Sequence, residues 1–574
     1  MKKIIAVLIA LVLTIAATGQ TLNVQVGSVV YQFPAGQAGE MNFADGTTLT
    51  VMGKTFTLAD IDAMTVDDTE VTDNLVSVEY GTASATVYVA GNVAQYVTPT
   101  VNGARVSIEQ LNTEAVDDDE ITYQLSGAAS NGSLTLSGSY KCTVSLAGVT
   151  LANPSGAAIN ITNSKRIQIS VKKDTENTLT DGANGEQKAC IYSKGQLQLQ
   201  GNGTLNVVGK TKHGIKSASY ISIKNLTLNI TSTVGDGINC EEYFQMKSGT
   251  VTISGVGDDG LQCDLGGTAS TGETTDHEDE DSGNIYIEGG TLTIENSAAG
   301  GKGIKADGAI SFTDGTVNIN VTGSNVKTGN DTTAAKGIKA DGAITISGGN
   351  ITSNAKNHEA IETKSTLTIS GGTVYAFSSS DDAINSAGHM HLEGGSVTGV
   401  SNGNDGIDSN GNMYIEGGTV IACGSGQPEC GLDAAERYNL YITGGTVLAI
   451  GGGNNTVTST SGSQCVLSTS ASPAAGTAVS VMSGSTTLVS FTVPADYSPT
   501  NGGGGPGGWG GWGAPGGGGP GGGGPGGGPG GGGQDSSSFS YLLSCSGLTS
   551  GTEYTVTIGS SSTKCKAAST YSGR

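Results

Sequence analysis

Positive charge and aromatic side chains are both scarce in this chain. Its 574 residues include 27 lysines and arginines against 51 aspartates and glutamates, and only 5% are aromatic. The formal net charge of −24 argues against nucleic acid and anionic membranes as partners, because both repel a strongly acidic protein. The same acidity suits hard divalent cations, which prefer oxygen ligands.

Motifs that mark common catalytic and metal sites are also missing. The sequence contains no HExxH, no phosphate-binding loop, no CxxC pair and no pattern typical of a nucleophilic triad. Arginine is so rare that Arg166 and Arg437 are the only two inside the repeats described below. Carboxylates are so common that no single pair indicates a hydrolase.

Long apolar runs are limited to the amino terminus. Lys2 and Lys3 precede an apolar stretch over residues 4–17, and small residues follow it. This layout is typical of a secretory signal peptide, here residues 1–19, and the run is short for a membrane span. We therefore expect a secreted protein, extracellular, at the cell surface or in the periplasm. Nine cysteines permit disulfides there, and Cys423 with Cys430 is the best candidate pair.

Glycine, in contrast, is abundant and patterned, with 94 copies. A Gly/Ala–Ile/Leu pair recurs, and five of its eight spacings between Ile215 and Leu432 are 23 residues. Weaker earlier copies bring the number of repeats to about eleven. Each copy also carries a block such as IYIEGGTLTI from residue 285 or MYIEGGTVIA from residue 413. Alternating polarity with glycine corners predicts short strands.

A repeat of this length cannot bury its own inner face, so the copies must stack at about 4.8 Å per coil. The sequence therefore predicts an all-β fold, a parallel β-helix over residues 105–460. A β-propeller is the alternative, but its blades need about 40 residues or more. We expect a small β-rich domain over residues 20–104 and a C-terminal β module over 461–574. A Gly/Pro-rich insert, residues 502–533, interrupts that module.

Residues 23 positions apart become vertical neighbours in such a fold. Acidic residues then form two columns, one on each side of the Gly/Ala–Ile/Leu pair. Carboxylates about 5 Å apart repel each other unless a cation lies between them. Calcium accepts about six to eight oxygens in irregular geometry. The alternative is a solvated ladder of acidic turns. The predicted calcium ligands are Asp236, Asp259, Glu359, Glu362, Asp382, Asn385, Asp405, Asp408 and Asp433.

A third column places rings on three successive coils. His391, Tyr414 and Tyr441 share it, with Glu393 and Glu416 alongside. Rings on a rigid sheet with polar neighbours are typical of a carbohydrate-binding surface. An aromatic ladder that only supports the sheet is the alternative.

The repeated DGI and ISGGT rungs, with the C-terminal segment TLVSFTVPADYSP, resemble a secreted bacterial carbohydrate-binding domain family. The resemblance covers roughly residues 105–570 and leaves residues 20–100 outside. It implies a right-handed, pectate-lyase-like parallel β-helix with bound calcium, and binding of plant polysaccharides such as cellulose or acidic pectin. The acidic-Gly-Ile rungs of the family correspond here to Asp236, Asp259, Glu359, Asp382 and Asp405.

Three functions compete on this evidence. The favoured one is a monomeric, non-catalytic polysaccharide-binding protein stabilised by calcium. The second is a calcium-dependent pectate-type lyase, in which calcium acidifies a uronate α-proton and a base such as Lys305 or Lys339 removes it. The third is a structural surface adhesin without a small ligand. No compact group of a base and an arginine supports the lyase.

Overall fold

The computed structural model describes residues 19–39, 41–231, 234–267, 280–500 and 539–573. The predicted signal peptide, apart from Gly19, and the predicted insert over 502–533 lie outside the described residues. The chain divides into two compact units: Met1–Lys356 with Thr363–Ser365, and Asn357–Glu362 with Thr366–Arg574. Among the described residues, no helix is long and apolar enough to cross a bilayer.

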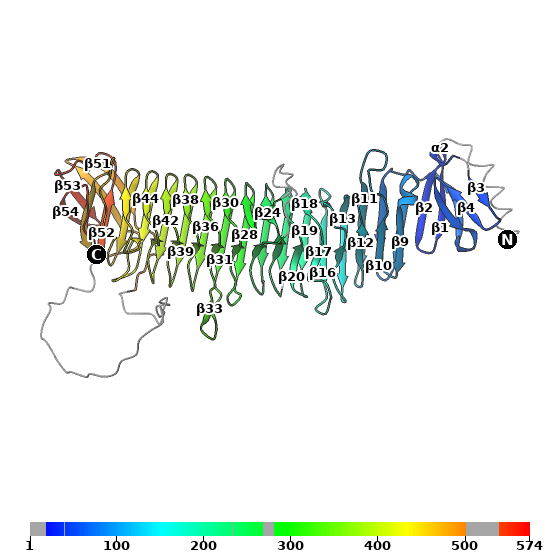
Figure 1. The fold of residues 1–574 in the computed structure, drawn as a ribbon, viewed down its shortest axis with the longest axis horizontal. Helices are drawn as coiled ribbons and strands as arrows, with labels where there is room; N and C mark the ends of the chain where they lie inside the picture. The colour runs from blue at the N-terminus through cyan, green and yellow to red at the C-terminus, as the bar shows by residue number, and fades with distance from the viewer. Residues whose placement is uncertain (1–18, 40, 232–233, 268–279, 501–538, 574) are drawn as a thin grey trace. The chain divides into compact units, whose positions relative to one another are not determined.

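Both units are built from coils of a parallel β-helix. The coils number about 13, against the prediction of about eleven. The repeat count fell short because the first coils, which contain β10 (Arg105–Gln110) and β12 (Ser133–Gly138), lack the Gly–Ile corner on which that count depends. Figure 1 shows the equivalent strands of successive coils lying side by side within each unit.

A coil consists of three short strands separated by sharp corners. In one coil of the second unit these are β40 (Ile384–Ser386), β41 (Met390–Leu392) and β42 (Ser396–Ser401). Each strand pairs in parallel with its counterpart in the next coil, so that Ile384 lies beside Ile407. Apolar side chains alternate inward, and Ile384, Met390 and Leu392 are fully buried. Stacking the coils therefore joins their interiors into one core within each unit.

The Gly-Gly corners are required by backbone geometry. Gly395 has a φ of +72° and Gly418 a φ of +70°, which glycine adopts far more readily than other residues. A Cβ on Gly395 would lie 2.5 Å from the carbonyl oxygen of Gly372 in the preceding coil. The second glycine of the block thus allows both the turn and the close approach of adjacent coils.

A column of small residues lines the interior. Its members follow the key Ile or Leu by two positions, and each is at most 1% exposed. They are Ser217, Cys240, Cys263, Ala306, Ala340, Thr363, Ser386, Ser409 and Ala434.

The amino-terminal residues form a β domain that covers the first coils. Its strands are β1 (Thr21–Val26), β2 (Val29–Pro34), β6 (Ala63–Asp67), β7 (Leu75–Tyr80) and β8 (Ala85–Ala90). β7 pairs in parallel with β11 (Ile121–Ala129), placing Leu75 beside Thr122. The domain therefore continues one sheet of the β-helix directly. This pairing satisfies backbone groups that an open first coil would expose.

The C-terminal module covers the last coil in a similar way. β52 (Phe539–Ser544) pairs antiparallel with both β48 (Thr446–Gly451) and β49 (Val466–Ala471). β50 (Ala478–Ser483), β51 (Thr486–Thr492), β53 (Glu553–Ile558) and β54 (Ser561–Lys566) form a separate antiparallel sheet. The Tyr497 hydroxyl donates a hydrogen bond of 2.6 Å to the Gly424 carbonyl, which ties the module to a coil corner.

All nine cysteines, which lie among the described residues, are free thiols. The predicted disulfide between Cys423 and Cys430 is therefore not formed. Cys423 packs in the core with Val400 and Ile450, whereas Cys430 lies in a coil corner beside Asp405, so the two side chains belong to different environments.

The remaining strands complete the two units. In the first unit the ladder that contains β10 and β12 continues through β14 (Ile159–Ile161), β17 (Ala189–Ser193), β20 (His213–Ser217), β23 (Ile238–Glu241), β26 (Leu261–Asp264), β29 (Ile304–Ala306) and β34 (Ile338–Ala340). A second ladder runs through β11, β13 (Cys142–Asn153), β15 (Ile167–Val171), β18 (Leu197–Gly201), β21 (Ile221–Lys224), β24 (Tyr243–Met246), β27 (Asn284–Ile287), β30 (Ile310–Phe312) and β35 (Ile344–Ile346). A third runs through β13, β16 (Glu176–Asp181), β19 (Thr204–Val208), β22 (Thr227–Thr231), β25 (Thr250–Ser254), β28 (Thr291–Asn296), β31 (Thr316–Val321) and β36 (Asn350–Ala355).

The second unit adds β38 (Leu367–Ile369), β39 (Thr373–Ser378), β43 (Ile407–Ser409), β44 (Met413–Ile415), β45 (Thr419–Cys423), β46 (Leu432–Ala434) and β47 (Leu440–Ile442). β37 (Ile361–Thr363) lies where the units meet in the sequence. Hairpins and short helices are β3 (Asn42–Ala44), β4 (Thr48–Val51), β5 (Lys54–Thr57), β9 (Val97–Asn102), β32 (Val326–Thr328), β33 (Asp331–Thr333), α2 (Ala35–Ala38), η1 (Leu58–Asp60) and η2 (Gly91–Tyr96).

Candidate functional site

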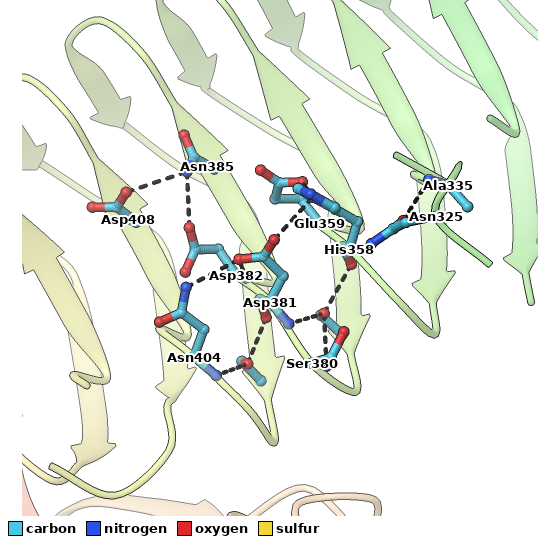
Figure 2. A network of polar contacts seen from close by, with 12 residues as sticks. Asn325, Ala335, His358, Glu359, Ser380, Asp381, Asp382, Asn385, Asn404 and Asp408 are labelled. Atoms are coloured by element: carbon cyan, nitrogen blue, oxygen red, sulfur yellow. Dashed lines mark hydrogen bonds and ion pairs between the residues drawn. The ribbon is translucent and has the colours of Figure 1, made fainter. Parts of the chain in front are cut away.

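Most of the predicted calcium ligands lie along one corner of the coils in the second unit. We call this set the corner ladder: Glu359, Glu362, Asp382, Asn385, Asp405, Asp408 and Asp433. Its members flank the starts of β37, β40, β43 and β46. Figure 2 shows several of them gathered with neighbouring residues at this corner.

The register of the ladder agrees with the prediction. Asn385 lies directly beside Asp408 in the parallel pairing of β40 with β43, and Asp408 beside Asp433 in that of β43 with β46. On the other side of the corner, the Asp405 backbone N–H donates a hydrogen bond of 3.1 Å to Asp382 Oδ1. Residues 23 apart are therefore vertical neighbours.

The aspartates also satisfy the backbone of the coil that follows. Asp405 Oδ1 accepts a hydrogen bond from the Cys430 N–H, as Asp382 does from Asp405. Asp382 Oδ2 in turn accepts a hydrogen bond of 2.8 Å from the Asn385 side-chain amide. The solvated-turn alternative thus describes part of the geometry, because these side chains cap turns. It does not describe their burial.

Burial makes the charged form of these carboxyl groups unfavourable. Asp382 is 5% exposed and Asp405 is 7% exposed. Burial, aided by repulsion from Asp405, raises the pKa of Asp382 well above its ordinary range. Burial, with repulsion from Asp433 and Asp408, does the same to the pKa of Asp405. Burial and the charges of Asp382 and Asp433 raise the pKa of Asp408 as well. These shifts favour the protonated form of the corner acids, and a bound cation would relieve the same repulsion.

Two compact groups of ligand atoms emerge along the ladder, each spanning no more than 4.8 Å. One contains Asp405, Cys430 and Asp433, and the other contains His358, Glu359 and Asp381. Four members of the ladder, Glu362, Asp382, Asn385 and Asp408, belong to neither group, so the predicted ligands do not share a single centre. Sequence reasoning missed His358 and Asp381, although each directly precedes a predicted ligand in the chain.

The His358 group already contains a cation of its own. His358 Nδ1 lies 2.9 Å from Asp381 Oδ2 and also contacts the Glu359 carboxylate. Burial alone lowers the pKa of His358, but the bonds to Asp381 and Glu359 outweigh it and raise the pKa to about 9. A protonated imidazole therefore offsets one of the two carboxylate charges of this group near neutral pH.

The Asp405 group is the better fit for calcium, because its carboxylates are hard oxygen donors without such an internal cation. Asp433 lies on the surface side of the corner, and its Oδ1 accepts a hydrogen bond of 3.0 Å from Asn455. The Cys430 thiol is a soft group and does not suit calcium.

In the first unit, Asp236 and Asp259 occupy the same corner positions and lie in one group with Asp258. Asp236 Oδ1 accepts a hydrogen bond of 3.0 Å from the Asp259 N–H, and Asp236 Oδ2 lies 3.2 Å from His213 Nδ1. Burial raises the pKa of Asp259 to about 7, although the nearby Lys302 opposes the shift. In this unit, the basic residues His213 and Lys302 thus offset part of the negative charge of the corner aspartates.

The lysines considered as lyase bases are held by acids instead. Lys339 Nζ lies 2.5 Å from Asp341 Oδ1, and Lys305 Nζ lies 3.9 Å from Asp307 Oδ1. Each pair links neighbouring side chains on the same face of one strand end. An ion-paired ammonium is a weak base, so this geometry does not favour proton abstraction.

The predicted rings form one continuous stack in the second unit. The ring centroids of His391 and Tyr414 are 4.6 Å apart with planes inclined by 12°, and those of Tyr414 and Tyr441 are 5.2 Å apart at 17°. Face-to-face contact covers both faces of Tyr414, so a sugar cannot lie flat on that ring. The stack instead presents ring edges and hydroxyl groups.

Polar groups accompany those edges. His391 Nδ1 lies 3.2 Å from Glu416 Oε2, and the Asn412 side-chain amide donates a hydrogen bond of 3.0 Å to the Tyr414 hydroxyl. Glu393 and Glu416 are exposed, and the ligand atoms of both lie within 4.8 Å of His391. The surface offers donors and acceptors spaced one coil apart.

Part of the chain is similar to known carbohydrate-binding proteins. Residues 103–383 match the model of a family described as carbohydrate-binding domain-containing protein. The resemblance drawn from the repeated rungs is thereby confirmed over this range, which ends earlier than the predicted residue 570. A carbohydrate-binding domain-containing protein of Acetivibrio thermocellus is 24% identical over 135 residues, which are 21% of this chain and 47% of that protein. The chain thus spans about half the length of this relative.

A solved structure also aligns with the chain. It is the polysaccharide lyase-like protein from C. thermocellum in its gadolinium derivative, 20% identical, covering 47% of this chain and 96% of that one with a TM-score of 0.36.

Proposed function

We propose that this chain is a secreted, non-catalytic polysaccharide-binding protein whose second unit is stabilised by calcium. The observation that supports polysaccharide binding most directly is the match of residues 103–383 to a carbohydrate-binding family. The glycan class that we propose is a plant cell-wall polymer, either pectin or cellulose. The leader-like residues 1–19 support export.

The ring stack is the proposed contact surface for the glycan. Its Tyr414 and Tyr441 hydroxyls both donate and accept hydrogen bonds, and the exposed Glu393 and Glu416 carboxylates accept them. Sugar hydroxyl groups need partners of both kinds. An extended polymer that crosses successive coils would contact His391, Tyr414 and Tyr441 in turn, which favours a polymer over a single sugar.

Calcium is proposed for the Asp405 end of the corner ladder. Asp405 and Asp433 would supply carboxylate oxygens, and Asp408 is the neighbour best placed in register to assist. When bound, the ion would neutralise carboxylates that burial and mutual repulsion otherwise push toward protonation. Because the unfolded chain lacks this arrangement, binding would stabilise the folded state.

A pull-down on insoluble cellulose and on calcium-crosslinked pectin tests the glycan part. Wild-type protein should be retained on at least one polymer, and the double variant Tyr414→Ala with Tyr441→Ala should be retained less. Retention on neither polymer would favour the adhesin over the binder. Incubation with polygalacturonate should yield no unsaturated product, and its appearance would replace the binder with a lyase.

A further inference from the structure

A groove lies where the amino-terminal β domain meets the first coils, within the first unit. Its volume is about 320 Å³, toward the lower end of the range for ligand pockets. Outward-facing residues of β9, β10, β12 and β14 form its floor, and the first three of these strands lie side by side in Figure 1. We call it the Arg105 groove.

Strand register places polar side chains in a row across this floor. Ser107 of β10 is the direct partner of Thr100 in β9 and of Thr135 in β12. Asn160 in β14 continues the row as the partner of Thr135. Neighbouring strands are about 4.8 Å apart, so the row extends about 14 Å. Its hydroxyl and amide groups can both donate and accept hydrogen bonds, as sugar hydroxyls require.

Arg105 is the only charged residue in the lining of the groove. Its Nε and Nη2 donate hydrogen bonds of 3.2 and 2.7 Å to Asn131 Oδ1, and Nη2 donates one of 2.9 Å to Ser155 Oγ. These acceptors are neutral, so they fix the guanidinium without neutralising it. Arg105 forms no ion pair with a described residue, and the N–H groups of Nη1 have no acceptor among the residues that the structure describes. Its charge and two of its donors are therefore available to a ligand.

A positive groove without acids is unusual in this chain. The sequence contains four arginines and 51 acidic residues, and Arg166, which lies in the coils, contacts the Glu120 carboxylate. Another groove of the first unit, of about 280 Å³ in the amino-terminal domain, is lined by Glu70 and Glu79 and by no basic residue. The Arg105 groove thus favours an anion where most of the surface opposes one.

Asn160 adds an acceptor that the protein leaves unsatisfied. Its Oδ1 is buried and has no hydrogen-bond partner among the described residues, although the residue itself is partly exposed and lines the groove. A buried polar atom without a partner is unfavourable. A ligand hydroxyl group in the groove would supply the missing donor.

The amino-terminal region forms one side of the groove. β9 ends at Asn102, directly before residues 103–383, which match the carbohydrate-binding family. β9 pairs antiparallel with β10, so Asn102 lies beside Arg105. On another side, Gln187 lies against Gly156, where a Cβ would be 2.7 Å from the Gln187 Oε1. The groove therefore depends on both regions rather than on the coils alone.

We propose that the Arg105 groove binds a saccharide that carries a carboxylate group, a uronate, and that residues 97–102 complete this site. Arg105 Nη1 donates charge-assisted hydrogen bonds to the carboxylate, and the polar row binds the sugar hydroxyls. The site needs no metal ion, because Arg105 supplies the positive charge. The inference rests on the proposed polysaccharide-binding function, but it concerns a surface separate from the ring stack and gives the amino-terminal region a role.

Calorimetric titration of the full chain with oligogalacturonate and with its methyl ester, in the presence of a calcium chelator, tests the proposal. The ester keeps the sugar chain and removes its charge. Oligogalacturonate should bind, and the ester should bind about tenfold more weakly or less. Arg105→Gln should weaken oligogalacturonate binding by about tenfold and bring the two ligands to similar affinities. The control Arg437→Gln changes the same charge at an exposed site in the second unit and should keep the wild-type preference.

A second pair of variants leaves Arg105 unchanged, so the test does not depend on the folding of one variant. Thr100→Glu places a carboxylate on the β9 side of the floor and should weaken oligogalacturonate binding. Thr100→Gln has a similar size without the charge and should weaken it less. An ester that binds wild type as well as the acid does, or wild-type affinity in both Arg105→Gln and Thr100→Glu, would overturn the proposal. With wild type still retained on pectin or cellulose, that result would leave the proposed function standing, whereas retention on neither polymer would remove the function itself.

Discussion

The backbone N–H of Asp405 donates a hydrogen bond of 3.1 Å to the side chain of Asp382, one coil earlier in the chain. The same relation joins Asp259 to Asp236 in the first unit at 3.0 Å. A carboxylate that accepts this hydrogen bond lies between two coils of the β-helix, where it has little contact with water. This position explains why the corner acids are buried although acidic side chains usually remain exposed.

Calcium dependence is the most direct prediction from this corner. Adding calcium to chelated protein should raise the melting temperature, with a stabilisation of about 2.7 kcal/mol at a hundredfold excess over Kd. The double variant Asp405→Asn with Asp433→Asn should lose this response, because amides keep the size of the side chains but remove their charge. Asp341→Asn, an exposed acid paired with Lys339, is the control and should respond like wild type. Scanning calorimetry with and without chelator measures the effect, and an unchanged wild-type melting temperature would refute the calcium proposal.

Stability without calcium should depend on pH through Asp259. Its folded pKa of about 7 is raised above an unfolded value near 4, so the folded state holds the proton more tightly. The contribution is therefore full below about pH 4 and is lost as pH rises to about 7, by at most about 4 kcal/mol. Asp259→Asn should flatten this part of the profile. Urea unfolding of chelated protein at several pH values provides the measurement, and parallel profiles for variant and wild type would contradict it.

The ring stack allows the supporting and binding roles of Tyr414 to be separated. Tyr414→Phe keeps the ring between His391 and Tyr441 but removes the hydroxyl that accepts from Asn412. It should change stability by only about 1 kcal/mol and reduce retention on the glycan. Tyr414→Ala should cost roughly 2 kcal/mol or more, because it removes both stacking contacts. If Tyr414→Phe binds glycan as well as wild type does, the hydroxyl edge is not the contact and the ladder only supports the sheet.

Corner glycines should be intolerant of any side chain. Gly395→Ala introduces a Cβ at a φ of +72° and places it 2.5 Å from a backbone oxygen. Gly476 shares the φ of +72°, but nothing lies within 4 Å of its Cβ position. Both variants incur the backbone penalty of about 1 kcal/mol, and only Gly395→Ala adds an overlap of about 1–3 kcal/mol. Denaturant midpoints should rank accordingly, and equal losses would show that coil contact does not restrict the corner.

Period and register could be predicted from sequence because they depend on spacing alone. A repeat of 23 residues suffices to place Asp382 beside Asp405 and His391 beside Tyr414. The small interior column was predictable for the same reason, since positions such as Ser386 and Ser409 cannot hold large side chains between packed coils. The first coils were not recognised as repeats, because their corners lack the Gly–Ile pair.

Side-chain direction could not be read from spacing. The column of rings was visible in the sequence, but the inclination of 12° that covers the ring faces depends on rotamers set by neighbouring strands. The partnership of His358 with Asp381 depends on the path of the chain just before the repeated pair, where coils differ.

The corner spacing also has a consequence for how such a chain changes over time. Residues 383–405 form one complete turn, because Ile384 is the direct partner of Ile407, the equivalent residue of the next turn. Recombination that duplicates or removes this stretch would leave every later turn in phase. Each added copy would also bring its own acids, so the number of proposed calcium sites would grow with the number of turns, without any new fold having to arise.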